Sequence, residues 1–497
     1  MHRILLAMAC AVLAPAAVSA QTWNEVRSPQ FTVLTDGSEG RGREVAWQFE
    51  QIRAAFPWAR PQLDRPVVIV AARDENSMRQ LLPVVFKQSA RDILPVSITS
   101  ILPDRHVIVL QSDYRSEDVA GTINPYFASY WSYSELMLNA AFERPLPRWF
   151  VRGLSAVLSN SLVKRNEIDF GRPIPWMLQS LNESRAALPA LLEMTADDPY
   201  LRSDVNRQRF DAQSWGLVHY LLFGRPANRA DAINQISKLL GEGRRSTDAI
   251  TQVFGSVESL DSAYREFQRR PVTQFARLAV DTRVNRDTFA LRATQPEEVA
   301  TMRALVHLAF GEPADAKAML VKARPGGAEP AESYAVEALL LEQERQGAAA
   351  LAAYRKAVEL KSQNFYPHFR VAIEMAQPGT RNDREGAERH FRESIALNAA
   401  YGSAHAMLAN LLANGPKPES AVEPARRAVL LDPGDAQTRL IYAYVLRRTG
   451  QLAAANGMAL SARSLASSDT EREAQEMIDE IAADIARTAP ALPGAPK

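Results

Sequence analysis

Near the start of the chain, hydrophobic residues gather in short segments with the spacing of strands and helices. Residues 31–34 have a strand-like pattern that ends at an Asp-Gly turn, and apolar runs at 66–70 and 106–110 predict two more buried strands. Residues 42–56 have apolar positions at helical spacing instead. The positions that share one face of this predicted helix are Val45, Phe49, Ile52 and Phe56. Such a mixture of strands and helices indicates an α+β domain.

Farther along, from about residue 296, the chain becomes rich in Ala, Leu, Glu and Arg, and its pattern repeats. Small residues late in the second helix of each predicted helix pair recur at steps of 34, 37, 34 and 34 residues. They are Ala323, Ala357, Ser394, Ala428 and Ala462. Small residues let paired helices approach closely, and a period near 34 is typical of tetratricopeptide (TPR) repeats. We therefore predict about five repeats over residues 297–470, followed by a capping helix.

These patterns divide the chain into five segments. Residues 1–20 are a predicted signal peptide, and residues 21–275 form the α+β domain. Residues 276–295 are predicted as a linker or a short β extension, because their apolar positions alternate. The repeat array with its capping helix covers residues 296–486, and residues 487–497 are predicted to be a disordered tail.

The signal peptide has a basic start, an apolar stretch from Ile4 to Leu13, and a small-residue cleavage site that ends at Ala20. It is too short to span a membrane. The mature chain should begin near Gln21, which places the protein in the periplasm or outside the cell. The one cysteine of the chain, Cys10, lies inside the signal, so we expect no disulfide in the mature protein.

Composition narrows the classes of partner. The chain has 58 basic and 57 acidic residues and a net charge of +1, which gives no broad attraction to nucleic acid or to an anionic membrane. With 46% apolar residues, its 497 residues suffice for more than one packed core. The array predicts a different kind of partner, a protein or peptide bound on its concave face, because stacked repeats leave an extended groove.

Candidate chemistry lies in residues 126–159, YFASYWSYSELMLNAAFERPLPRWFVRGLSAVLS. The segment resembles the two-helix core of gluzincin-type metallopeptidases. In that family, a His-Glu-x-x-His helix is followed by a Pro-Leu-Pro-x-Trp loop and by a helix that brings the third zinc ligand. Two histidines at i and i+4 share one helical face and reach one zinc ion, while the Glu deprotonates the bound water.

The resemblance maps each metal-binding position onto a residue that cannot serve. With one residue of length difference allowed in the loop, the two histidine positions fall on Trp131 and Glu135, and the general base falls on Ser132. The third ligand falls on Arg152. Trp does not bind zinc, Ser is a poor base near neutral pH, and Arg brings a fixed positive charge. The resemblance therefore implies a decayed site with no metal, no catalytic residue and no cofactor, in which Glu135 and Arg152 could pair with each other.

The resemblance extends over about residues 23 to 275, in an order of segments similar to secreted bacterial peptidase-like domains of the peptidase MA and DUF1570 groups, which are often followed by TPR repeats. It implies an α+β zincin-like N-terminal domain followed by an all-α TPR solenoid. In such peptidases a small sheet lies over the helix of the first two ligands, and its edge strand holds an extended substrate. A similar groove is expected here.

Other chemistries find little support in the sequence. There is no phosphate loop, no G-x-S-x-G elbow, and no paired ligand spacing among the remaining histidines. His219, on a helix predicted over residues 212–223, is a possible cleft residue, but a histidine beside Trp215 and Tyr220 is more often part of a core.

Three functions remain open at this point. The first is an exported pseudopeptidase joined to a TPR scaffold, which binds proteins or peptides in the cell envelope without cleaving them. The second is a divergent active metallopeptidase, and the third is a purely structural TPR scaffold. A cleft lined by polar groups favours the first over the third, whereas a filled cleft around Trp131 and Arg152 favours the third.

Overall fold

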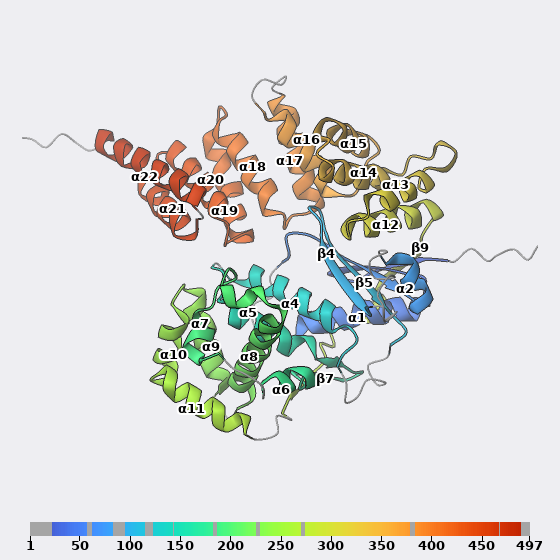
Figure 1. Cartoon of the computed structure of the whole chain (residues 1–497). Coiled ribbons are helices and arrows are strands. Elements are labelled where there is room, and N and C mark those ends of the chain that lie inside the picture. Colours follow the sequence, from blue (N-terminus) through green and yellow to red (C-terminus); the bar gives the residue numbers. More distant parts are fainter. Residues whose placement is uncertain are drawn as a thin grey trace, which may run out of the picture.

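The computed structural model describes residues 22–56, 62–82, 95–114, 123–142, 144–181, 186–224, 229–269, 274–377, 383–466 and 468–488. The predicted signal peptide and all but the first two residues of the predicted tail lie outside these ranges. In the described part, a mixed α/β region is followed by an array of paired helices that arches over it (Figure 1).

A six-stranded mixed sheet forms the centre of the first region, with strand order β4-β5-β3-β2-β1-β9. Strands β2, β3 and β5 are parallel, whereas β4 at one edge and β1 and β9 at the other are antiparallel to their neighbours. The inner strands β3 and β5 are buried at every position, as expected for strands covered on both faces. The strands span Asn24–Arg27 (β1), Phe31–Thr35 (β2), Val67–Ala72 (β3), Ser97–Ile101 (β4), His106–Gln111 (β5) and Ala290–Ala293 (β9). The three strands predicted from the sequence are confirmed.

Helices cover one face of this sheet and build the rest of the first region. The helix predicted over 42–56 is α1, which runs from Glu39 to Ala54 and begins earlier because the Ser38 side chain caps it. Three helices carry the candidate site: α4 (Phe127–Ala141), α5 (Arg148–Ser159) and α8 (Asp204–Phe223). The other elements here are α2 (Glu75–Leu81), α6 (Pro175–Leu181), α7 (Leu188–Glu193), α9 (Arg229–Gly241), α10 (Ser246–Phe254), α11 (Val257–Gln268) and a small sheet of β6 (Leu162–Val163), β7 (Glu167–Phe170) and β8 (Ala276–Ala279).

A glycine sets how closely two of the site helices pack. A Cβ atom at Gly153 on α5 would lie 2.3 Å from the backbone oxygen of Ser214 on α8. No side chain fits at that distance, so the absence of one lets α5 and α8 cross with their backbones in near contact. This close crossing brings side chains of the two helices within reach of each other.

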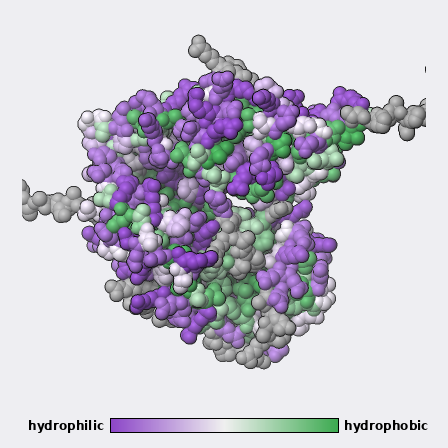
Figure 2. Space-filling view, turned by 180° about the vertical axis from the view of Figure 1, so that it is seen from behind, coloured by the Kyte–Doolittle hydropathy of each residue, from purple (hydrophilic) through white to green (hydrophobic). Residues whose placement is uncertain are grey.

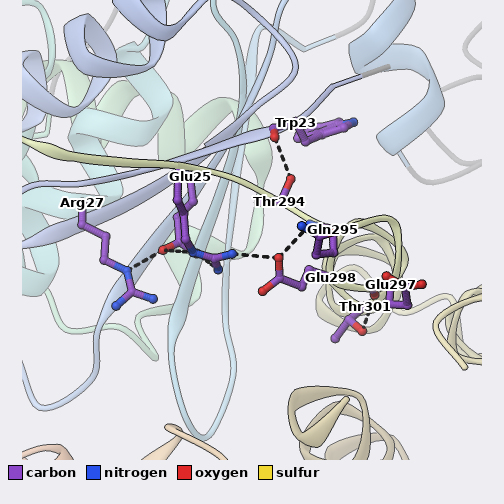
Figure 3. Close-up of polar contacts among 9 residues, drawn as sticks. Trp23, Glu25, Arg27, Thr294, Gln295, Glu297, Glu298 and Thr301 are labelled. Carbon is purple, nitrogen blue, oxygen red and sulfur yellow. Dashed lines mark hydrogen bonds and ion pairs between the residues drawn. The ribbon is translucent and has the colours of Figure 1, made fainter. Parts of the chain in front are cut away.

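Residues 276–295 contribute strands to two different sheets. Strand β8 pairs with β7, and β9 pairs with β1 at the edge of the large sheet. Arg292 on β9 then reaches both Glu25 on β1, at 2.6 Å, and Glu298 on the first array helix, at 2.8 Å. Figure 3 shows this polar chain continuing to the backbone of Gln295, which Glu298 caps. The first helix of the array therefore leaves the sheet in a defined direction.

In the part of the array that the structure describes, there are five antiparallel helix pairs and a last helix, as the repeat pattern predicts. The small residues at the 34- to 37-residue steps are all completely buried where the paired helices meet. The helices span Pro296–Ala309 (α12), Pro313–Lys322 (α13), Ala331–Gln343 (α14), Gly347–Glu359 (α15), Phe365–Met375 (α16), Arg384–Leu397 (α17), Gly402–Ala413 (α18), Val422–Leu431 (α19), Ala436–Arg448 (α20), Leu452–Leu465 (α21) and Ser468–Thr488 (α22).

The second face of the large sheet shares its core with the array. Val70, Val107 and Val109 of the sheet belong to one buried cluster together with Met302 and Leu305 of α12 and with residues farther along the repeats. The outer surface carries hydrophilic residues over both regions, with hydrophobic ones scattered among them (Figure 2). The two regions thus pack as one body.

Candidate functional site

The four positions singled out in the sequence lie on α4 and α5, and three of their side chains meet. Trp131 and Glu135 are one turn apart on α4, and the indole N–H of Trp131 donates to Glu135 Oε1 at 2.9 Å. Arg152 on α5 donates from Nη1 to the same oxygen at 2.8 Å. The expected pair of Glu135 and Arg152 is therefore present.

A fourth residue, Asp211 on α8, completes the cluster. Arg152 donates to both oxygens of the Asp211 carboxylate, from Nε at 2.8 Å and from Nη2 at 2.5 Å. This two-pronged geometry is the strongest form of an arginine–carboxylate pair. The guanidinium carbon also lies 4.4 Å from the centre of the Trp131 ring, at cation–π distance. Arg152 therefore joins α4, α5 and α8.

The electrostatics of this cluster keep its acids ion-paired. Burial opposes the charge of Arg152, but the hydrogen bond and charge of Asp211, with those of Glu135, outweigh it and raise the pKa of Arg152. The side chains are only partly accessible, with exposed fractions of 27% for Arg152, 28% for Glu135 and 14% for Asp211. Freeing either carboxylate to act as a base or a metal ligand would require breaking its contact with the guanidinium.

A cleft lies beside the cluster, between α4 and the edge strand β4. Its volume is about 280 Å³, close to the lower limit for small-ligand sites. Ser132 lies in the cleft, where it accepts a hydrogen bond from the Thr99 hydroxyl at 2.9 Å. Within the described residues β4 pairs only with β5, so its outer edge has no strand beside it there. The lining residues are Thr99, Ser100, Ile101, His106, Val107, Ile108, Ser132, Tyr133, Glu135, Leu136 and Asn139.

His219, a possible cleft residue in the sequence analysis, lies instead in the core, which was the alternative stated there. Its side chain is completely buried, and its Nε2 atom is 3.2 Å from the Gly171 carbonyl and 3.0 Å from the Gln274 carbonyl. The rings of Trp215 and Phe223 pack against its imidazole, with centroid-to-centroid distances of 5.1 and 4.6 Å. Burial lowers the pKa of His219 to about 4, so the ring is neutral and donates from Nε2 to the backbone.

Asp211 is the site residue that the sequence analysis missed. The helix predicted there starts at Ala212, one residue after it, whereas α8 begins at Asp204. The available signal was an acidic residue directly after Phe210 and one turn before Trp215, two fully buried aromatics. An acid within such a stretch needs a buried cationic partner.

Among the described residues of the array there is one cluster of possible metal ligands and one pair of neighbouring histidines, which the spacing of the histidines in the sequence did not indicate. His307, Glu312 and Asp315, at the turn between α12 and α13, each offer a ligand atom within 4.8 Å of the others. His307 Nδ1 lies 2.8 Å from Glu312 Oε2, so an ordinary hydrogen bond already explains that contact. On the neighbouring helices α16 and α17, the Nδ1 atoms of His368 and His390 are 3.0 Å apart.

No family model matches the sequence, and no curated protein matches it. Solved structures match about a third of the chain. YrrB, a TPR protein with an unusual peptide-binding site, is 16% identical over 36% of this chain and 90% of its own, with a TM-score of 0.31. The protein pilF of Pseudomonas aeruginosa is 17% identical over 40% of this chain and 93% of its own, with a TM-score of 0.29. MamA of Desulfovibrio magneticus RS-1 is 16% identical over 35% of this chain and 96% of its own, also with a TM-score of 0.29. With scores this low, the assignment of the array rests on its own period and helix pairing.

Within the described residues, no helix combines the length and the apolar character needed to cross a bilayer.

Proposed function

We propose that the chain is an exported, non-catalytic peptidase-like protein that binds polypeptide segments in the cell envelope. The observation that carries this proposal is the cluster of Glu135, Arg152 and Asp211. A hydrolytic zinc site needs free ligands and a free base, whereas here one guanidinium on α5 is paired with the acids of both α4 and α8. The resemblance to decayed gluzincins and the predicted signal peptide supply the rest of the proposal.

The cleft beside the cluster supports binding of an extended peptide. An edge strand with an open side can accept another strand through backbone hydrogen bonds, and the lining side chains then select the sequence. Ser132 and Asn139 offer polar contacts on the α4 wall, and Ile101 on β4 is 59% exposed. A strand laid against β4 would cover this exposed isoleucine.

A second candidate, a purely structural role, is favoured by a separate observation. Trp131 and Arg152 are stacked and partly buried, so the former ligand positions are filled, and the sheet shares its core with the array. In this case the cleft would bind nothing, and the first region would serve only as a base for the repeats.

Metal content and cleavage test the non-catalytic part of the proposal. We expect the purified mature protein to contain no stoichiometric zinc by mass spectrometry and to leave a pool of unstructured peptides intact. The combined variant Trp131→His, Ser132→Glu, Glu135→His, Arg152→Glu, with Asp211→Asn to remove the stranded acid, should gain zinc. Stoichiometric zinc in the natural chain, or peptide cleavage that a chelator abolishes, would contradict the proposal and favour a divergent active metallopeptidase.

Peptide binding separates the first candidate from the second. A fluorescent library of extended nine-residue peptides should bind the natural chain, and Asn139→Trp, which fills the cleft, should abolish that binding. Asn234→Trp on α9 is the matched control, because Asn234 is also an exposed helical asparagine. Absence of any binding peptide, or equal loss in both variants, would favour the structural role.

A further inference from the structure

The turn between β4 and β5 reaches the middle of the array (Figure 1). At its tip, Asp104 accepts two hydrogen bonds from Arg105, at 2.9 and 2.6 Å, and a third from the side-chain amide of Asn364 at 2.6 Å. Arg105 also forms an ion pair with Glu332 at the start of α14. Asp104 is 1% exposed, so these contacts are shielded from solvent.

Two asparagines from neighbouring helix pairs of the array also contact the first region. Asn364 is the N-cap residue of α16, whereas Asn398 lies at the end of α17, in the turn that leads to α18. Each side chain uses Oδ1 to accept the backbone N–H two residues later, at 3.0 and 3.1 Å. Each then directs its NH₂ group to the first region, Asn364 to Asp104 and Asn398 to the carbonyl of Asp64 at 2.8 Å.

This arrangement belongs to the array and not only to the turn. The backbone hydrogen bond that each Oδ1 accepts, at a helix N-cap for Asn364 and in a turn for Asn398, fixes which end of the amide points outward, so both asparagines are oriented donors. One repeat after Asn398, the chain has Asp432, whose side chain has no N–H group to donate. These donors are therefore confined to the middle of the array.

Apolar contacts accompany the polar ones. Leu102, at the start of the turn, is 3% exposed and belongs to the same buried cluster as Phe365 and Tyr366 of α16 and Tyr401 before α18. The array thus contacts an apolar side chain, a carboxylate and a guanidinium within four consecutive residues.

We propose that the array surface formed by Glu332, Asn364 and the aromatic residues beside them, called the row from here on, is a binding site for a polypeptide turn with the sequence apolar–x–acid–arginine. The turn Leu102-Pro103-Asp104-Arg105 is its resident ligand, and a partner protein that presents the same chemistry competes with it. The carboxylate binds Asn364, the guanidinium binds Glu332, and the apolar residue enters the aromatic cluster.

The energetics allow such competition. A ligand tethered in the same chain acts at an effective concentration of about millimolar, so weak contacts suffice to keep it bound. The resident ligand is also imperfect, because Asp104 Oδ1 is buried without a hydrogen-bond partner among the described residues. A partner that supplies a donor there gains an interaction that the resident turn lacks.

Displacement of the turn would have a consequence for the cleft. The same hairpin carries Thr99 and Ile101, which line the cleft wall, only a few residues before the tip. Occupation of the row by a partner would therefore release one wall of the cleft. The row itself is a separate surface, so the proposal stands or fails independently of the cleft's function.

A binding experiment on the full mature chain tests the site. The probe is a fluorescein-labelled cyclic peptide with the residues of 99–108, compared with the same peptide in which Ala-Ala replaces Asp-Arg. By anisotropy we expect little binding to the natural chain and at least about tenfold tighter binding to Asp104→Ala/Arg105→Ala, whose row is vacant. Adding Glu332→Ala should reverse that gain, whereas Glu385→Ala, another first-turn acid on an array helix, should not.

A charge exchange provides a second test that does not alter the buried turn. Glu332 is 39% exposed, so Glu332→Arg should fold normally. This variant should prefer a peptide with Asp-Glu in place of Asp-Arg by about tenfold. Any of three results would overturn the proposal. The Ala-Ala peptide could bind as tightly as the Asp-Arg peptide, or the Asp-Arg peptide could fail to bind a folded Asp104→Ala/Arg105→Ala variant. In the third case, Glu332→Arg would not change which peptide the protein prefers.

Discussion

Arg152 and Arg105 are two of the arginines that each hold two carboxylates, yet they have different structural roles. Arg152 binds Glu135 and Asp211 within the first region and stacks on Trp131. Arg105 binds Asp104 beside it and Glu332 across the boundary with the array. The first cluster joins three helices of one core, whereas the second joins two parts of the chain that are over two hundred residues apart.

The comparison shows that an arginine paired with two carboxylates can stabilise a core in one place and form a contact that opens, here called a latch, in another. Arg152 makes its contacts inside the first region, where its bidentate partner Asp211 is 14% exposed and Trp131, on which it stacks, is 7% exposed. The pair of Arg105 and Glu332 has one partly exposed acid on a helix surface, so it can open while both regions stay folded. We therefore assign Arg152 to stability and Arg105 to reversible docking.

Removing the guanidinium of Arg152 should have the largest effect at neutral pH. Arg152→Ala leaves Glu135 and Asp211 facing each other in a partly buried place, and we expect a loss of about 2–3 kcal/mol in the free energy of unfolding. The measurement is urea denaturation followed by tryptophan fluorescence. The exposed Arg202 provides the control variant Arg202→Ala, which should change little. A triple variant, Glu135→Gln/Arg152→Met/Asp211→Asn, removes the two carboxylates as well as the guanidinium. If this variant were no more stable than Arg152→Ala, the unpaired carboxylates would not be the cause of the lost stability.

Acid should weaken the first region through His219, without altering either arginine. Its folded pKa of about 4 lies below the ordinary value near 6.5, so the unfolded state binds the proton more readily. The stabilisation is complete above about pH 6.5 and is lost as the pH falls toward 4, by roughly 3 kcal/mol.

Melting temperatures across this pH range check the His219 prediction. His219→Gln keeps a donor for the two carbonyls but does not titrate, so its stability should vary less between pH 6.5 and 4. The same slope in both proteins would show that other groups dominate the acid response.

The predictions from sequence succeeded where local patterns carry the information. Strand and helix periodicity located β2, β3, β5 and α1, and the small residues located all five helix pairs, because burial of one face repeats along the chain. The contact between Glu135 and Arg152 followed from the resemblance, which supplied the relative placement of two helices. Asp211 was missed through a helix boundary that was predicted too late.

The contacts between the first region and the array, which we call the junction, could not be predicted in the same way. It joins Asp104 to Asn364 and Asp64 to Asn398, and no local period relates residues so far apart in the sequence. The predicted concave-face ligand was an external protein or peptide, whereas in the structure the chain's own turn contacts the middle of the array.

Neutralising Glu332 should separate the two clusters further. Glu332→Gln removes the charge that holds Arg105 but leaves the core intact, so we expect less than about 1 kcal/mol of change in stability. The turn should nevertheless open more often, and amide exchange of residues 102–106 should speed up by about five- to tenfold. Exchange of α4 and α5 should stay as in the natural chain. Equal acceleration in both regions would contradict the view of the junction as a local latch.

The smallest expected effect concerns Asp432, at the end of the junction. Loss of hydration, followed by the charges of Asp435 and Asp64, raises the pKa of Asp432 to about 6, against the opposing charge of Arg65. A raised folded pKa means that the docked state binds the proton better, so docking strengthens as the pH falls through 6 and weakens above it. Asp432 keeps an exposed surface, and solvent screens much of this effect. Amide exchange around residues 62–66 should therefore slow slightly from pH 7 to 5 after correction for intrinsic rates. Asp432→Asn should remove that change, and its persistence in this variant would assign the pH response of the junction to another group.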